Sequence, residues 1–199
     1  KITFIILAII CSMMAYITFS RMFMIISTGT QSISWMQIIT SWRKGLYSFI
    51  SQKTLFKTRP IIGLIHALVA WGFTLYLIVN VFDVLYGFIP GFKFLPNHLV
   101  GHLYRLFVDV FSVMVLAGVI YFLIRRFIQN DQKLIIEKPV MLSELAIRGM
   151  RFDSALVGLF IIIHVGARFL SASFEIAHAK PDRTQPFANM VAKLWVNME

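Results

Sequence analysis

The chain contains four long apolar stretches, each separated from the next by a more polar segment. Each stretch has about the 20 apolar residues that a helix needs to cross a hydrocarbon core, and no strand-like alternation is present. The segment at about residues 34–56 mixes Trp35, Trp42 and Tyr47 with basic residues, which is typical of an amphipathic helix at a membrane interface. The pattern predicts an all-α integral membrane helical bundle with about four transmembrane helices plus this interfacial helix. The predicted spans are residues 2–26, 60–88, 101–124 and 153–179.

Composition favours the same class. Hydrophobic residues make up 58% of the 199 positions and charged residues only 14%, which is about half the usual share. The net charge of +10 is concentrated in the segments between the first two and the last two spans, so it indicates membrane topology and not nucleic-acid binding. By the positive-inside rule these segments face the cytoplasm. We therefore expect a multi-pass protein of a bacterial-type inner (cytoplasmic) membrane, with its N-terminus outside.

The chain ends and the single cysteine bear on its organisation. Cys11 lies in the first apolar stretch, so the chain by itself forms no disulfide and no cysteine-ligated iron–sulfur cluster. We expect residues 1–199 to form one membrane domain. The first residue is Lys1, and we expect the sequence to be either a segment of a longer protein, with partner elements outside it, or a processed chain.

Polar residues in the last two spans recur at helical spacing. At 100° per residue, those of the fourth span fall on one stripe roughly 80° wide. The stripe consists of His164, Arg168, Ser171, Glu175 and His178, and the third span carries a matching stripe of His98, His102, Arg105, Asp109 and Ser112. Because ionisable side chains are costly in lipid, we expect the two stripes to face each other or a polar group between them. The pairs Arg105–Asp109 and Arg168–Glu175 explain part of this charge.

The five histidines all lie in or at the end of a predicted span. Imidazole is a good ligand of haem iron, and the 19 phenylalanines can line an apolar slot. His66 and His164 lie at similar depths and predict an inner haem b, whereas His178 with His102 or His98 predicts an outer one, so one or two haems are expected. Zinc is disfavoured because the histidines are spread over opposite membrane depths. The candidates for pairing with the haem propionates are Arg59, Arg105 and Arg168.

Three stretches carry a resemblance to a known family. They read RPIIGLIHALVAWGF from Arg59, DVFSVMVLAGVIYFLIRR from Asp109 and HVGARFLSASFEIA from His164. Over about residues 1–190 they resemble the nitrate reductase gamma-subunit-like cytochrome b membrane domain, in particular that of membrane-bound iron–sulfur oxidoreductases related to heterodisulfide reductase. The resemblance implies a b-type cytochrome that exchanges electrons with a quinone pool, with His66 as a haem ligand. It also implies a further membrane helix and a cysteine-rich cluster domain outside these residues.

The resulting hypothesis is a haem b-binding membrane subunit that transfers electrons between a quinone and an iron–sulfur or flavin partner. Such a chain would be part of a quinone-linked oxidoreductase complex, and whether it is itself an enzyme stays open. Asp83, Asp109 and Glu175 are candidates for proton exchange with the quinone. Two alternatives remain: a proton- or ion-coupled transporter subunit whose path is lined by the polar stripes, and a structural membrane anchor in which the stripes pack helices together.

Overall fold

The fold is described from a computed structural model, which describes residues 1–29, 34–92, 98–129 and 144–196. This part of the chain is helical and contains no strand, so the predicted all-α fold is confirmed. Four helices are long and apolar enough to span a membrane, which makes the chain a multi-pass membrane protein; they are Ile2–Ser27, Pro60–Phe88, Leu99–Ile128 and Gly149–His178. The chain divides into two compact units, Lys1–Phe49 and Ile50–Glu199, which are described separately. The single membrane domain expected for residues 1–199 stays a prediction.

The first unit contains α1 (Ile2–Ser27) and most of α2 (Trp35–Ser51). No residue of α1 is buried, and its side chains are apolar on every side, as suits a helix surrounded by lipid. In α2 the exposed apolar residues recur every three or four positions, from Trp35 to Phe49, so the helix is amphipathic as predicted. It ends at Ser51, before the predicted residue 56, because Gln52 takes a left-handed conformation with φ of 46°.

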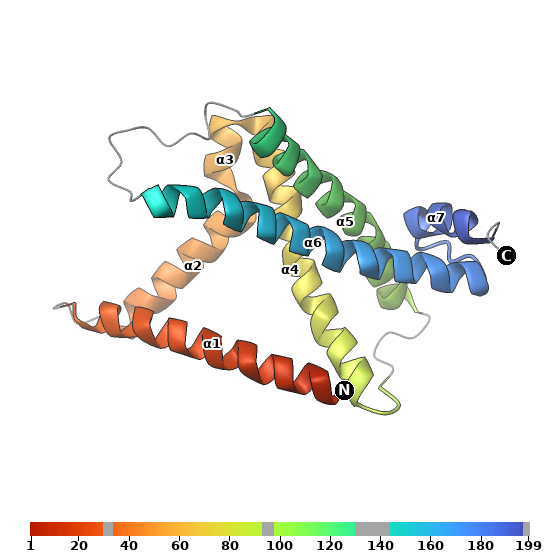
Figure 1. Cartoon of the computed structure of the whole chain (residues 1–199), viewed down its shortest axis with the longest axis horizontal. Helices are drawn as coiled ribbons and strands as arrows, with labels where there is room; N and C mark the ends of the chain where they lie inside the picture. Colours follow the sequence, from red (N-terminus) through yellow and green to blue (C-terminus); the bar gives the residue numbers. More distant parts are fainter. Residues whose placement is uncertain (30–33, 93–97, 130–143, 197–199) are drawn as a thin grey trace. The chain divides into compact units, whose positions relative to one another are not determined.

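The second unit contains five further α-helices and one π-helical turn (Figure 1). They are α3 (Lys53–Thr58), α4 (Pro60–Phe88), α5 (Leu99–Leu123), the π turn η1 (Ile124–Ile128), α6 (Glu144–His178) and α7 (Pro186–Val196). Pro60 occupies the first turn of α4, where its missing N–H needs no partner. Two features differ from the prediction: α6 begins before residue 153, and α7 lies after the last predicted span, where no helix was expected.

Small residues allow α4 and α5 to pack closely. A methyl group at Gly72 would collide with the Val115 side chain. One at Gly118 would lie 2.5 Å from Val69 Cγ2, so each helix receives a valine of the other against a glycine. Such close approach of backbones is typical of membrane helices, which gain little from hydrophobic association within lipid.

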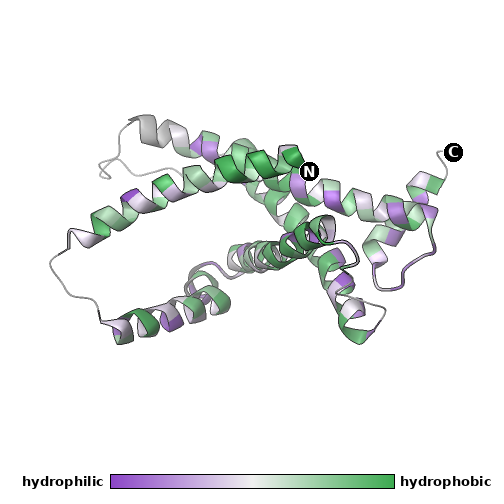
Figure 2. Ribbon diagram, turned by 90° about the horizontal axis from the view of Figure 1, so that it is seen from below, coloured by the Kyte–Doolittle hydropathy of each residue, from purple (hydrophilic) through white to green (hydrophobic). Residues whose placement is uncertain are grey.

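The centre of this unit lies where α6 joins that pair. Tyr76, Val115, Val119 and Val165 form the buried cluster, contributed by α4, α5 and α6. Figure 2 shows these long helices mainly in green, with a more purple connection leading into α7 beside the C-terminus. Most apolar side chains on the outer faces are exposed, because the bundle has no aqueous surface along these spans. The packed centre separates two polar regions, one near the start of α4 and one near the start of α5.

Candidate functional site

A cavity of about 910 Å³ lies among α3, α4, α5, η1 and α6. We call it the His66 cavity. Its apolar lining comes from all three long helices and comprises Leu55, Ile62, Val69, Val119, Phe122, Leu123, Val157, Gly158 and Ile161. Its polar lining consists of Arg59, His66, Arg125, Arg126, Asp153 and Ser154. A mostly apolar cavity with a few convergent polar groups is the usual form of a ligand site.

Three arginines reach the His66 cavity from two different elements. Arg59 immediately precedes α4, and η1 carries both Arg125 and Arg126. Arg125 is only 6% exposed, and Arg126 donates a hydrogen bond to the Met150 carbonyl across 3.3 Å. A π turn has more residues per turn than an α-helix, and such turns often occur at functional sites. Here the turn places two consecutive guanidinium groups along one cavity.

His66 lies in the second turn of α4 and faces the same cavity. Its ring meets the edge of the Phe122 ring, with centroids 6.2 Å apart. The donor set fits one end of a haem, because an imidazole, an aromatic wall and guanidinium groups for carboxylates occur together. His66 is the single histidine among the described lining residues, so the cavity offers one imidazole and not two.

The structure does not bring His164 to His66. His164 Nε2 donates to Asn80 Oδ1 across 3.2 Å, and its ring also contacts Tyr76 and stacks on Phe160. Asn80 follows His66 by fourteen positions on α4, which is about 21 Å of helix. The expectation that His66 and His164 lie at similar depths and share one haem is therefore wrong in this arrangement. His164 contacts Asn80, which lies much nearer the C-terminal end of α4 than His66 does. A ligand role for His164 by itself stays a prediction.

The remaining histidines also lie apart. His98 precedes the first turn of α5 and is exposed. The guanidinium group of Arg105 donates to His102 Nδ1 across 2.9 Å. His178 Nδ1 donates to the Phe174 carbonyl across 3.0 Å, which makes Nε2 its basic nitrogen. The predicted outer haem between His178 and His102 or His98 stays a prediction.

The charged residues of the stripes find partners other than those expected. Arg168 donates two hydrogen bonds to Asp83, at 2.8 and 3.0 Å, and not to Glu175. Arg105 forms an ion pair with Asp182, at 3.0 Å. The pairing Arg168–Glu175 is wrong, because Asp83 on α4 offers a better-placed carboxylate, whereas the pairing Arg105–Asp109 stays a prediction. Of the α6 stripe, His164 and Arg168 are bonded to residues of α4.

Asp109 holds the first turn of α7. Its two carboxylate oxygens accept hydrogen bonds from the backbone N–H groups of Phe187, at 2.8 Å, and Ala188, at 2.9 Å. The first N–H groups of a helix lack partners within it, and a carboxylate there also interacts favourably with the helix dipole. Asp109 therefore acts as an N-cap supplied by a different helix.

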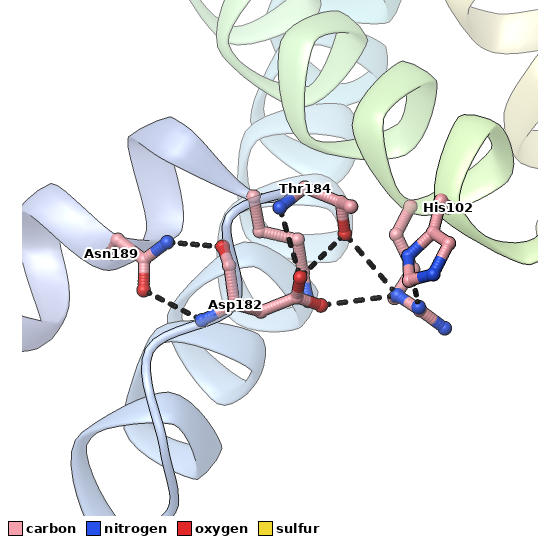
Figure 3. A network of polar contacts seen from close by, with 6 residues as sticks. His102, Asp182, Thr184 and Asn189 are labelled. Carbon is pink, nitrogen blue, oxygen red and sulfur yellow. Dashed lines mark hydrogen bonds and ion pairs between the residues drawn. The ribbon is translucent and has the colours of Figure 1, made fainter. Parts of the chain in front are cut away.

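Asp182 holds the connection that leads into α7 (Figure 3). It accepts hydrogen bonds from the Thr184 backbone N–H, the Thr184 hydroxyl and the Gln185 amide, besides its ion pair with Arg105. The Asn189 side chain bonds the Asp182 backbone on its other side. Burial raises the pKa of Asp182, but the Thr184 and Gln185 hydrogen bonds and the Arg105 charge outweigh it, so the pKa is lower than the ordinary value of 3.8. We call Arg105, Asp109, Asp182, Thr184, Gln185 and Asn189 the α7 anchor.

Sequence reasoning missed Arg125, Arg126 and Asp153 as cavity residues and missed α7 altogether. The arginine pair was assigned only to membrane topology, and nothing in its spacing shows that a π turn follows Leu123. For α7 there was a signal: Pro186 suits a first helical turn, and apolar residues follow at positions 187, 190, 191 and 194. Comparison of the chain with protein-family models, with curated proteins and with solved structures found no match.

Proposed function

We propose that the chain is a haem b-binding membrane subunit of a quinone-linked oxidoreductase in a bacterial-type inner membrane. It would pass electrons between a quinone and an iron–sulfur or flavin partner. The observation that carries the proposal is that His66, Arg59, Arg125 and Arg126 line one mostly apolar cavity between membrane helices. An imidazole together with guanidinium groups in such a slot matches two parts of a haem, its iron and its propionates.

Each group has a defined role in this proposal. His66 would supply a nitrogen ligand to the haem iron, and Phe122 restricts the orientation of the His66 ring. Arg59, Arg125 and Arg126 balance the propionate charge, and the apolar lining excludes water, so that burial and nearby charge tune the reduction potential. When bound, the haem supplies a one-electron redox centre.

The pairing of the outer charges bears on where quinone exchanges protons. Asp83 is bonded to Arg168 and Asp109 to α7, so protonating either carboxylate would break a structural contact. Glu175 is exposed on α6. Of the three predicted acidic residues, Glu175 is thus the one that can exchange a proton at the least structural cost.

One observation favours the alternative function, a structural membrane anchor, for the outer half of the bundle. Its ionisable side chains are engaged with one another and with backbone groups, as expected where polar stripes serve helix packing. This role is compatible with a haem at the His66 cavity, because the two regions are separate. No comparable observation supports the alternative of a transporter subunit.

The test uses the natural full-length protein purified from its membrane. A dithionite-reduced minus oxidised absorbance spectrum should show a b-type α-band, and a pyridine haemochrome assay gives the haem count. His66→Ala should lose one haem per chain, whereas the control change Leu77→Ala, at an exposed position of the same helix outside the cavity, should lose none. An assembled protein without haem would overturn the proposal, and full haem content in His66→Ala would overturn the assignment of the cavity.

A further inference from the structure

Helix α7 carries apolar residues on two faces. One face, with Ala188 and Ala192, is buried against Ile176 of α6. The other face carries Phe187, Met190 and Leu194, which are 37%, 63% and 63% exposed. We call these three residues the α7 ridge. Two alanines four positions apart allow close helix packing in membranes, which accounts for the buried face. This packing does not account for the exposed apolar residues of the ridge.

The position of α7 along α5 gives its depth. From Arg105 to Arg125 there are twenty positions, or about 30 Å of helix, which equals the thickness of a hydrocarbon core. With Arg125 at one membrane boundary, Arg105 marks the other, and Asp109 lies about 6 Å further inside. Because Asp109 holds the N–H groups of Phe187 and Ala188, the first turn of α7 begins at this depth.

The polar groups around the start of α7 are arranged as a lipid boundary requires. Backbone N–H groups away from water must be paired within the protein, and Asp109 pairs two of them. Asp182 likewise engages the polar groups of Thr184 and Gln185 in the connection. Near the other end of α7, Trp195 donates its indole N–H to Ser173, and tryptophan is enriched at membrane interfaces.

We infer that α7 is a membrane-boundary helix whose ridge of Phe187, Met190 and Leu194 contacts the acyl chains of the leaflet on the His178 side. In this role the α7 anchor holds the helix at the boundary, and Asp109 is its positioning residue. The segment after α6 is then part of the membrane domain and not an external tail. The inference does not depend on haem or quinone.

Two other environments of the ridge are distinguishable by experiment. Water would surround it if α7 stood clear of the bilayer, and a second copy of the chain would cover it if the ridge were an oligomer interface. Site-directed spin labelling separates the three, since oxygen concentrates in lipid, a water-soluble nickel chelate concentrates in water, and neither reaches a protein interface.

The experiment places single labels in the Cys11→Ser protein reconstituted in phosphatidylcholine vesicles. Met190→Cys and Leu194→Cys test the ridge, Ile163→Cys on the exposed face of α6 is the lipid reference, and Arg183→Cys is the water reference. Both ridge labels should collide more with oxygen than with nickel, as at position 163, and the order should reverse at position 183. Nickel preference at the ridge, or low accessibility to both reagents, would overturn the inference.

A second variant tests the anchoring. Asp109→Asn keeps the size of the side chain and one acceptor oxygen but removes the negative charge. The label at position 190 should then gain mobility and lose its preference for oxygen, while the label at position 163 should not change. If Asp109→Asn leaves the label at position 190 unaltered, Asp109 does not position α7.

Discussion

The His66 cavity and the α7 anchor use the same kinds of side chain in opposite ways. Around the cavity, three arginines and one histidine line a space large enough for a ligand. In the α7 anchor, Arg105 forms an ion pair with Asp182, and the carboxylates of Asp109 and Asp182 accept hydrogen bonds from backbone N–H groups. The difference teaches that the same types of ionisable side chain can line a cavity in one part of a membrane bundle and hold helices together in another.

This comparison predicts different consequences for mutations in the two regions. Changes in the α7 anchor should act on stability, because they leave paired groups without partners. Replacing His66 of the His66 cavity should act on ligand binding and leave stability nearly unaltered. Four mutations or changes of condition test this division, from the largest expected effect to the smallest.

Asp109→Ala should lower the free energy of unfolding by about 2–4 kcal/mol, because it leaves two N–H groups of α7 unsatisfied. Unfolding of the purified protein in mixed detergent micelles measures this. The control is Glu175→Ala, at an exposed carboxylate of α6, which should change stability by less than about 0.5 kcal/mol. Equal losses in the two variants would show that Asp109 is not a structural cap.

Gly63→Ala tests the wall of the His66 cavity by overpacking. The added methyl group would lie 2.9 Å from the Leu55 backbone, so α3 must move, and we expect a loss of about 1–3 kcal/mol. Gly87→Ala, on the same helix, meets nothing within 4 Å and should cost nothing or stabilise slightly. Thermal unfolding measures the difference in stability between the two variants. A similar midpoint temperature for both would contradict the close contact of α3 with α4.

Acidification should release α7. The pKa of Asp182 is lower in the folded protein than its ordinary value of 3.8, so the carboxylate stabilises the fold at higher pH. That contribution should disappear as the pH falls below 3.8 and protons bind Asp182. Proteolysis of the connection between α6 and α7 measures the release with an acid-active protease, and Asp182→Asn should weaken its dependence on pH in that range, leaving the part due to Asp109. Unchanged protection of the natural protein there would contradict the prediction.

His66→Ala should change the free energy of unfolding of the ligand-free protein by less than about 0.5 kcal/mol, because the side chain faces the cavity and is exposed. Differential scanning fluorimetry measures this on ligand-free samples. A large loss would mean that His66 packs the core, and the contrast between the two regions would then fail.

The spans and their class follow directly from the residue pattern. Apolar runs of membrane-spanning length leave a helix as the only economical structure, and the structure places the four spans within a few residues of prediction except at the start of α6. His66 and Arg59, which were separate candidates from the sequence, both line the cavity, and they lie seven positions apart on one stretch of chain.

Partners on different helices could not be predicted in this way. Helical spacing tells which residues of one helix share a face, but the crossing of α4, α5 and α6 decides which face meets which helix. His164 therefore meets Asn80 and not His66, Arg168 meets Asp83, and Arg105 meets Asp182. In each case the deciding quantity is the rotation and shift of one helix against another.

Sequence alone determined that this protein crosses a membrane as a helical bundle, because hydrophobic length and backbone hydrogen bonding permit little else in lipid. It also singled out the histidines and charges as costly residues in need of a reason. Only the tertiary structure decided which of those residues serve packing and which line a cavity. The physical reason is that the cost of a buried charge depends on its partners, and close helix packing at residues such as Gly72 and Gly118 sets those partners.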